Sequence, residues 1–189
     1  QPAHPYNKVG PERLAEALSY FKDLCAKPGL IYEGDLTGNF ILPTSLGTFR
    51  PTCLVPQAMR NGNLLAPGPI LLLGIDGIKD CSPFWAAENL NHLNSQGKIF
   101  PAFRAASLEK LDLNGKAYNS LNLAQALDDP HFRDRFIAKI QPLLRKGERI
   151  GFPALLGFRF SRETFNALQE GLGSEIFEIS LPPPSIPGL

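Results

Sequence analysis

The stretch Pro69–Gly77, PILLLGIDG, is the most continuous apolar run in the chain, and turn-forming residues flank it on both sides. A half-exposed strand alternates polar and apolar residues, whereas a strand covered on both faces is apolar throughout. We therefore predict a fully buried strand over residues 70–74. The turn at residues 74–77 leads toward a helix, which is how a βαβ unit begins.

Three further segments have the composition of core strands and are separated by stretches with helical periodicity. Consecutive βα units cross over with a right hand, which gives a parallel sheet with helices on both faces. The sequence therefore predicts a three-layer α/β domain with a mainly parallel sheet. Its other core strands are expected at Lys98–Phe103, Ile150–Leu156 and Ile176–Leu181.

The composition bounds the class of protein. The chain has 189 residues, 43% of them hydrophobic, and a net charge of +1 without charged blocks. This length suits one well-packed domain, and the charge gives no basic stripe for nucleic acid. No apolar run approaches the roughly 20 residues of a membrane helix, and no leader is visible. We therefore expect a soluble cytoplasmic protein.

The cysteines and histidines indicate neither disulfides nor a metal centre. Cys25, Cys53 and Cys81 are odd in number and far apart, which favours buried thiols in a reducing compartment. The three histidines have no partners at metal-ligand spacing. These histidines are His4, His92 and His131, and we therefore predict no metal site.

The first part of the chain predicts one helix and a small β-rich appendage over residues 30–55. The helix begins at Pro11 and ends before Pro28-Gly29, and a buried face is expected for Leu14, Leu18, Phe21 and Cys25. The appendage reads as a small antiparallel β meander. Its pieces are Leu30–Glu33, Gly38–Pro43 and Thr48–Leu54.

One face of the third piece combines a guanidinium with two hydroxyls. The period of two along a strand places Thr48, Arg50 and Thr52 on the same side. Such a face is suited to an anion, because arginine binds phosphate and carboxylate groups with paired hydrogen bonds. The other interpretation is a solvated outer face, and residue types alone favour it.

The sequence contains no motif that identifies a reaction. Gly74-Ile75-Asp76-Gly77 follows a strand but lacks the spacing of a dinucleotide-binding loop, so no catalytic residue is assigned. Ligands of parallel sheets bind beyond the carboxyl ends of the strands. That rule points to Asp76, Arg104, Arg159 and the segment Pro182–Pro187. The irregular link Arg104–Ser120 is long enough to suggest a functional role.

Three stretches carry a resemblance that covers nearly the whole chain. They are AHPY at residues 3–6, PTSLGTFRPT at residues 43–52 and LPPPSIPG at residues 181–188. With them the chain resembles the B subunit of anaerobic glycerol-3-phosphate dehydrogenase, a flavoprotein related to the fumarate reductase flavin group. Such flavoproteins carry a glycine-rich fingerprint near the start and a second flavin-contacting segment near the end. Neither is present in this chain.

The resemblance implies a domain inserted between the two halves of a flavin-binding domain. Residues 1–189 would then be a single substrate or cap domain of a larger flavoprotein, with its two ends close together. The parent would hold FAD or FMN and oxidise glycerol 3-phosphate to dihydroxyacetone phosphate, passing electrons to quinone. The fragment alone is expected to hold no flavin and to be inactive, since flavin chemistry needs the cofactor.

The resemblance also implies partners and a site. The partners would be the flavin-binding domain of the same polypeptide, other dehydrogenase subunits and a small phosphorylated substrate, with peripheral attachment to the inner membrane through a partner subunit. The substrate- or flavin-facing residues would be Thr48, Arg50, Thr52 and Ser185. Two alternatives stay open: a docking module without a catalytic role, and a self-contained α/β enzyme that acts on a small molecule.

Overall fold

The computed structural model describes residues 8–78 and 81–180. The helices are α2 (Pro11–Ala26), α3 (Pro83–Ser95), α4 (Ser120–Leu127), α5 (Pro130–Ile140) and α6 (Ser161–Leu172), with short 3₁₀ helices η1 (Gln57–Gly62) and η2 (Gln141–Leu143). The strands are β1 (Tyr32–Glu33), β2 (Phe40–Pro43), β3 (Phe49–Thr52), β4 (Val55–Pro56), β5 (Ile70–Ile75), β6 (Phe103–Leu108), β7 (Arg149–Pro153) and β8 (Ile176–Ile179).

Strand β5 is the centre of a four-stranded parallel sheet in the order β6-β5-β7-β8. All six of its residues are buried, as the unbroken apolar run predicts. It runs beside β6 from Ile70 opposite Phe103 to Ile75 opposite Leu108, and beside β7 from Ile70 opposite Arg149. The predicted parallel sheet is confirmed.

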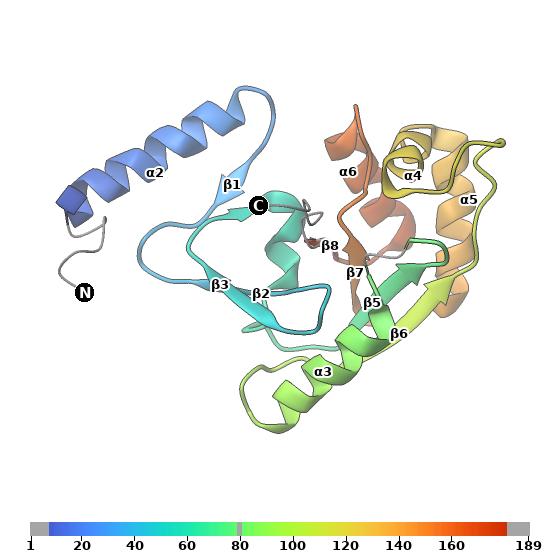
Figure 1. The fold of residues 1–189 in the computed structure, drawn as a ribbon, viewed down its shortest axis with the longest axis horizontal. Helices are drawn as coiled ribbons and strands as arrows, with labels where there is room; N and C mark the ends of the chain where they lie inside the picture. The colour runs from blue at the N-terminus through green and yellow to red at the C-terminus, as the bar shows by residue number, and fades with distance from the viewer. Residues whose placement is uncertain (1–7, 79–80, 181–189) are drawn as a thin grey trace, which may run out of the picture.

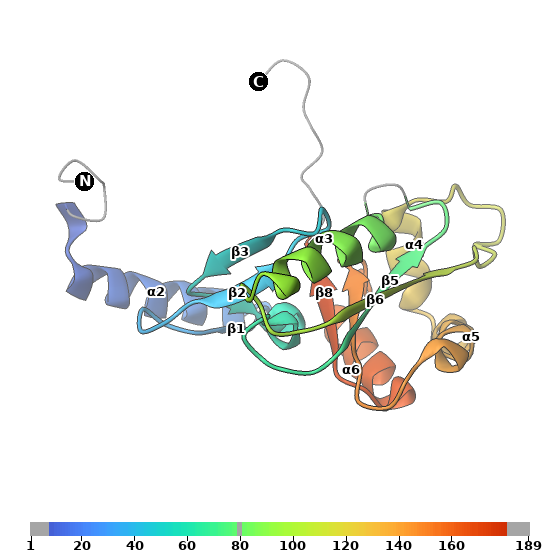
Figure 2. The same ribbon diagram turned by 90° about the horizontal axis from the view of Figure 1, so that it is seen from below.

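Helices cover both faces of this sheet, as Figures 1 and 2 show. Leu71, Leu73 and Ile75 point to one face, where they pack with apolar residues of α4, α5 and α6. Ile70 and Leu72 point to the other face, which α3 and the segment around Leu64 cover. Alternate side chains of β5 therefore pack into two separate cores, one on each face of the sheet. The three-layer α/β fold is confirmed.

The second core strand lies later in the sequence than the prediction. The structure has β6 at Phe103–Leu108, whereas the predicted segment was Lys98–Phe103. Pro101 lacks a backbone N–H and cannot donate to a ladder, and the Asn91 side-chain amide bonds both the N–H and the C=O of Phe103 at 2.8 Å. The part of the chain that was expected to be an irregular link from residue 104 therefore begins as a strand.

The antiparallel part of the fold consists of two separate strand pairs. β2 pairs with β3, from Phe40 opposite Thr52 to Pro43 opposite Phe49, whereas β1 pairs with β4. The prediction of β pieces over residues 30–55 holds, but they do not form one continuous meander. Gly34 explains the break, because its φ of 107° and its contact with the Cys53 carbonyl turn the chain away after β1.

The predicted buried face of α2 is wrong. The helix follows Gly10 as expected, but Leu14, Leu18 and Cys25 are only half-buried and Phe21 is 40% exposed. Figure 1 shows α2 set apart from the sheet and joined to it through β1. The apolar spacing predicted the helix itself, but within the described residues too little of the protein packs against these four side chains to bury them.

Among the helices that the structure describes, none combines the length and the apolar character needed to cross a bilayer. The expectations that fall on residues 1–7 and 181–189, including the positions of the two chain ends, lie outside the described residues.

Candidate functional site

The strand order reverses at β5, and the connections after β5 and β7 leave the carboxyl edge of the sheet on opposite faces. After β5 the chain passes to α3 on one face, and after β7 it passes to α6 on the other face. The two connections therefore diverge at adjacent strands. Ligands of open parallel sheets bind at such a position, so the residues just beyond β5, β6, β7 and β8 form the candidate site.

A polar group follows β5 and β6 at this edge. The Ser107 hydroxyl donates to Asp76 Oδ1 at 2.5 Å, and the Lys110 ammonium lies 5.4 Å from the centre of the Tyr118 ring. The pKa of Tyr118 is raised, mainly by burial and further by the Asp76 charge. Within the described residues, the buried Tyr118 hydroxyl has no hydrogen-bond partner. The group offers an unsatisfied hydroxyl, a carboxylate and a cation.

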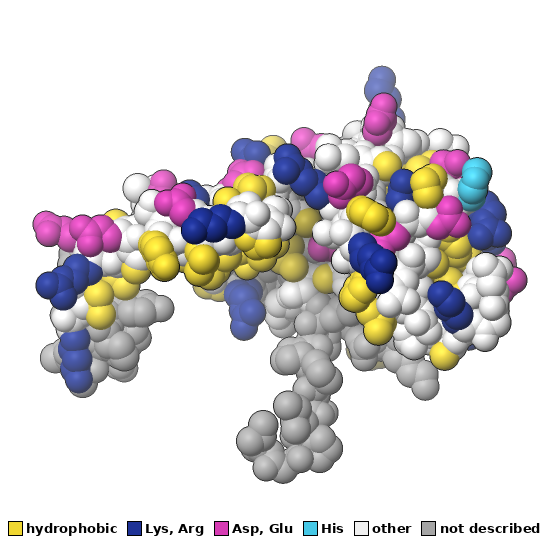
Figure 3. All heavy atoms as spheres, turned by 90° about the horizontal axis from the view of Figure 1, so that it is seen from above, with side chains coloured by type: hydrophobic (Ala, Val, Ile, Leu, Met, Phe, Trp, Pro, Cys, Tyr) yellow, Lys and Arg dark blue, Asp and Glu magenta, His cyan; other side chains and the backbone are white. Residues whose placement is uncertain are grey.

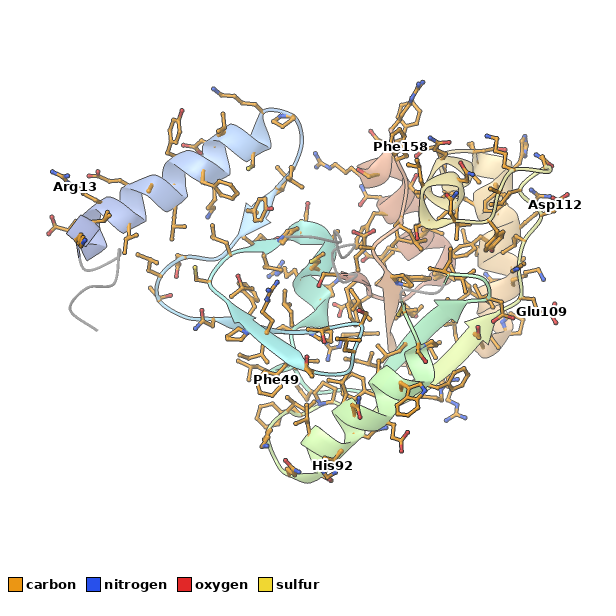
Figure 4. All side chains as sticks on the ribbon, in the orientation of Figure 1. Arg13, Phe49, His92, Glu109, Asp112 and Phe158 are labelled. Atoms are coloured by element: carbon orange, nitrogen blue, oxygen red, sulfur yellow. The ribbon has the colours of Figure 1, made fainter. Side chains whose placement is uncertain are left out.

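A hollow of about 350 Å³ lies beyond β7 and β8. Leu121 of α4 and Phe158 line it, and Phe158 is drawn in Figure 4 at the end of the molecule where α4 and α6 lie. Glu178 of β8 forms part of its wall and accepts the Leu156 N–H at 2.9 Å. Burial raises the pKa of Glu178, although backbone N–H groups at residues 155 and 156 oppose the shift.

Asp128 fixes the loop between β7 and α6. Its carboxylate accepts the backbone N–H groups of Phe158 at 3.0 Å, Arg159 at 2.8 Å and Phe160 at 3.2 Å. Burial alone would raise the pKa of Asp128, but these three donors and the Arg133 charge lower it. The carboxylate therefore stays ionised and orders the rim of the hollow.

A larger groove of about 560 Å³ adjoins the hollow, and Leu156, Ser161 and Glu178 line both. The groove separates the β1–β4–η1 region from α6. An ion pair joins Arg60 Nε to Glu33 Oε2 at 2.9 Å on one wall, and Gln169 lies on the other. The buried Gln169 Oε1 has no donor among the residues that the structure describes. The groove therefore combines apolar walls with groups of both charges.

The turn after β5 lacks the space of a dinucleotide-binding loop. A dinucleotide loop needs glycines whose missing Cβ leaves room for phosphate beside the backbone. At the end of β5 that room is already filled, because Pro83 packs on Gly74 and the Lys110 side chain packs on Gly77. The residues present thus do not fit the phosphates of a flavin dinucleotide at this turn, and we derive no reaction step through one.

Metal and thiol chemistry have little support at the site. Over residues 8–78 and 81–180, no three His, Cys, Asp or Glu side chains are grouped to hold a metal ion. Burial raises the pKa of Cys81 to about 11, so its thiol is protonated at neutral pH and is a poor nucleophile. The side chains gathered at this edge are suited to binding polar groups through hydrogen bonds and charge.

The predicted anion-binding face lies on the β2–β3 hairpin, outside the parallel sheet, as Figure 1 shows. The Thr48 hydroxyl shares a hydrogen bond of 2.8 Å with Thr44, and the Thr52 hydroxyl donates to the Leu54 carbonyl at 2.7 Å. Arg50 is exposed and forms no ion pair with any described residue. Ser185 lies outside the described residues. Whether this face contacts a substrate stays a prediction.

The candidate edge residues divide into correct and incorrect predictions. Asp76 and Arg159 do follow β5 and β7, whereas Arg104 lies near the amino end of β6. There its guanidinium binds the buried Glu148 carboxylate through contacts of 3.0 and 2.6 Å, so it serves the fold and not the edge. The misplaced strand caused this error.

Sequence reasoning missed four edge residues: Ser107, Tyr118, Asp128 and Glu178. Glu178 carried a usable signal, because it is the one acid within the apolar run IFEI. The other three depended on where β6 ends and on contacts between distant segments.

Comparisons with known proteins give a consistent result along the whole chain. The chain is 30% identical over 195 residues to the B subunit of anaerobic glycerol-3-phosphate dehydrogenase from Glaesserella parasuis, and 31% identical over 194 residues to that from Actinobacillus succinogenes. It is 29% identical over 197 residues to a probable B subunit of the same enzyme from Halobacterium salinarum. These alignments cover 99–100% of this chain but only 44–45% of each relative.

The resemblance inferred from the sequence motifs is thus confirmed, and the chain spans a little under half the length of the curated relatives it matches. No family model matches the chain, and no solved structure matches it significantly.

Proposed function

We propose that this chain is an internal domain of a flavin-dependent glycerol-3-phosphate dehydrogenase subunit. The complete protein would oxidise the secondary alcohol of glycerol 3-phosphate to the ketone of dihydroxyacetone phosphate, which releases two electrons and two protons. The electrons would reach quinone, and other dehydrogenase subunits would be partners. The domain itself would hold no flavin and would not turn over alone.

One observation carries the proposal. The similarity to proteins named as the B subunit of this dehydrogenase runs through 99–100% of this chain while covering 44–45% of each relative. The absence of a flavin-phosphate cradle at the end of β5 is compatible with a flavin bound by another part of the polypeptide. The domain would then contribute to the substrate side of the site.

Arg50 is the residue we propose for the phosphate. It is exposed, lies on β3 between Thr52 and Thr48, which directly precedes the strand, and has no carboxylate partner among the described residues. A guanidinium already paired with an acid would offer less charge to a phosphate. Ser185 is proposed for the same site on the resemblance alone.

The first experiment compares flavin content and turnover. The chain alone and the complete polypeptide encoded by its gene are purified, the latter with its partner subunits. Each is assayed for bound flavin and for glycerol 3-phosphate oxidation with a quinone acceptor. We expect flavin and turnover only in the complete protein. Stoichiometric flavin in the chain alone, or no oxidation by the complete protein, would contradict the proposal.

The second experiment tests Arg50 in the complete protein. Arg50→Ala is expected to weaken substrate or flavin binding by roughly 1.5–3 kcal/mol, the value of a lost charge-assisted hydrogen bond, or about 10- to 150-fold. Lys98→Ala is the control, because Lys98 is also an exposed cation without an ion pair in the described chain. Equal binding by both variants would remove Arg50 from the site.

A further inference from the structure

Helix α2 makes few contacts with the rest of the described chain. No residue from Glu12 to Ala26 is buried. The Phe21 ring lies 5.0 Å from the Tyr32 ring, and the Lys22 ammonium donates to the Gly34 carbonyl at 3.1 Å. In Figure 4, Arg13 marks the end of α2 that lies far from the sheet. Both of these contacts come from the second half of the helix.

One side of α2 carries exposed apolar residues at helical spacing. Ala17, Tyr20, Phe21 and Leu24 follow one another at positions i, i+3, i+4 and i+7, and we call them the α2 stripe. Tyr20 is 70% exposed, Phe21 40% and Leu24 48%. Figure 3 shows hydrophobic side chains gathered along α2. This spacing is the one with which an amphipathic helix enters an apolar groove of a partner.

The charges of α2 bear on the kind of partner. Its polar side carries Glu12, Glu16 and Asp23, and Arg13 and Lys22 flank these acids, so the helix has no excess of basic residues. A helix that lies on a membrane surface has lysines and arginines on its polar face, because they are attracted to anionic lipids. The charges of α2 therefore disfavour a lipid surface and favour a protein surface.

The length of the relatives indicates which protein surface this is. The matched relatives have more than half of their length outside the region aligned with this chain. The apolar surface also continues past α2, because Leu30 is 48% exposed and lines the 560 Å³ groove together with Ile31. We infer that the α2 stripe packs into an apolar groove formed by the portion of the same polypeptide outside residues 1–189. The inference rests on the proposed function and adds the surface through which the domain docks.

Hydroxyl-radical footprinting tests this contact. Labelling of Tyr20, Phe21 and Leu24 is measured in the chain alone, over a range of concentrations, and in the complete polypeptide. We expect at least fivefold slower labelling in the complete polypeptide. Labelling at equal rates in the two proteins would overturn the inference. Slower labelling of the chain alone as its concentration rises, with a dimer in sedimentation, would assign the stripe to a second copy and overturn it too.

Two variants of the complete polypeptide control for helix stability and charge. Leu24→Glu places a carboxylate in the stripe, and we expect Tyr20 labelling to return to the rate of the chain alone. Ser19→Glu places the same group on the polar side of α2, and Tyr20 should stay protected. Protection of Tyr20 that survives Leu24→Glu would contradict docking through the stripe.

The same preparations separate this inference from the proposed function. Suppose that the complete polypeptide oxidises glycerol 3-phosphate but its Tyr20 is labelled as fast as in the chain alone. The docking contact would then be overturned and the proposed function would stand. Protection of Tyr20 in a complete polypeptide that does not oxidise glycerol 3-phosphate would overturn the proposed function and leave the contact.

Discussion

Strand β5 and helix α2 are both recognisable from their apolar residues, yet every residue of β5 is buried and no residue of α2 from Glu12 to Ala26 is buried. β5 lies between two strands and two helical layers, all supplied by this chain. Within the described residues, α2 packs mainly against β1 and the turn after it. An apolar pattern therefore predicts that an element has a face to cover, and it does not say which segment covers that face.

The largest expected difference between the two regions is in side-chain truncation. Leu72→Ala removes a side chain that is 1% exposed, so we expect the free energy of unfolding to fall by about 2–5 kcal/mol. Urea unfolding followed by circular dichroism measures it. A loss below about 1 kcal/mol would mean that the core around β5 relaxes to fill the space.

An intermediate effect is expected for the ion pair at the amino end of β6. Glu148 is 6% exposed and binds Arg104 and the Arg145 N–H, so Glu148→Ala should cost roughly 1.5–3 kcal/mol. Glu109→Ala is the matched control, because its contact with Lys139 spans 3.8 Å at an exposed side chain. Equal losses in the two variants would show that the Arg104 contact adds nothing.

The pH dependence of one buried acid tests the carboxyl edge. The pKa of Glu178 is raised by burial, so the folded chain binds its proton more tightly than the unfolded chain does. Glu178 therefore reduces stability as the pH rises above the ordinary glutamate value. We expect Glu178→Gln, which keeps an acceptor for the Leu156 N–H, to gain stability relative to the wild type between pH 4 and pH 8.

Urea midpoints at several pH values measure this gain, with Glu170→Gln on the exposed side of α6 as the control for charge removal. A stability difference between Glu178→Gln and the wild type that stays constant across this range would show that Glu178 ionises in the folded chain as it does in the unfolded one.

The smallest effect is expected in the N-terminal region. Leu24→Ala and Arg50→Ala remove exposed side chains, so each should change the stability of the chain alone by no more than about 0.5 kcal/mol. Thermal unfolding of the two variants beside Leu72→Ala measures the contrast. A loss of several degrees in Leu24→Ala would mean that α2 packs more closely in solution and would weaken the comparison with β5.

The sequence was informative where one strand contacts two layers and weak where a strand lies at the edge of the sheet. β5 has an unbroken apolar run, whereas β6 reads FRAASL, with small side chains and a half-exposed arginine. The strand was predicted at the more apolar segment KIFPAF, residues 98–103, although Pro101 prevents regular pairing there. Ile99 is buried, but as part of the connection and not of the sheet.

The residues of the candidate site were predictable only where the strand before them was placed correctly. Asp76 was found because it follows a strand that was placed correctly, and Arg104 was misassigned because its strand was shifted. The contact between Asp128 and residues 158–160 joins segments 30 residues apart, and no local pattern encodes it. Long-range contacts of this kind depend on the finished topology.

The seam between η1 and the end of the sheet bears on how the chain folds during synthesis. The Asn61 side chain donates to the Ile176 carbonyl, Gly62 packs directly on the Phe177 ring, and the Arg149 guanidinium binds the carbonyls of Asn61, Asn63 and Ala66. The partners of residues 61–66 thus lie 83 to 115 residues later in the chain. Residues 61–66 cannot complete these contacts until residue 177 has been synthesised, so folding should be slow and sensitive to truncation before that residue.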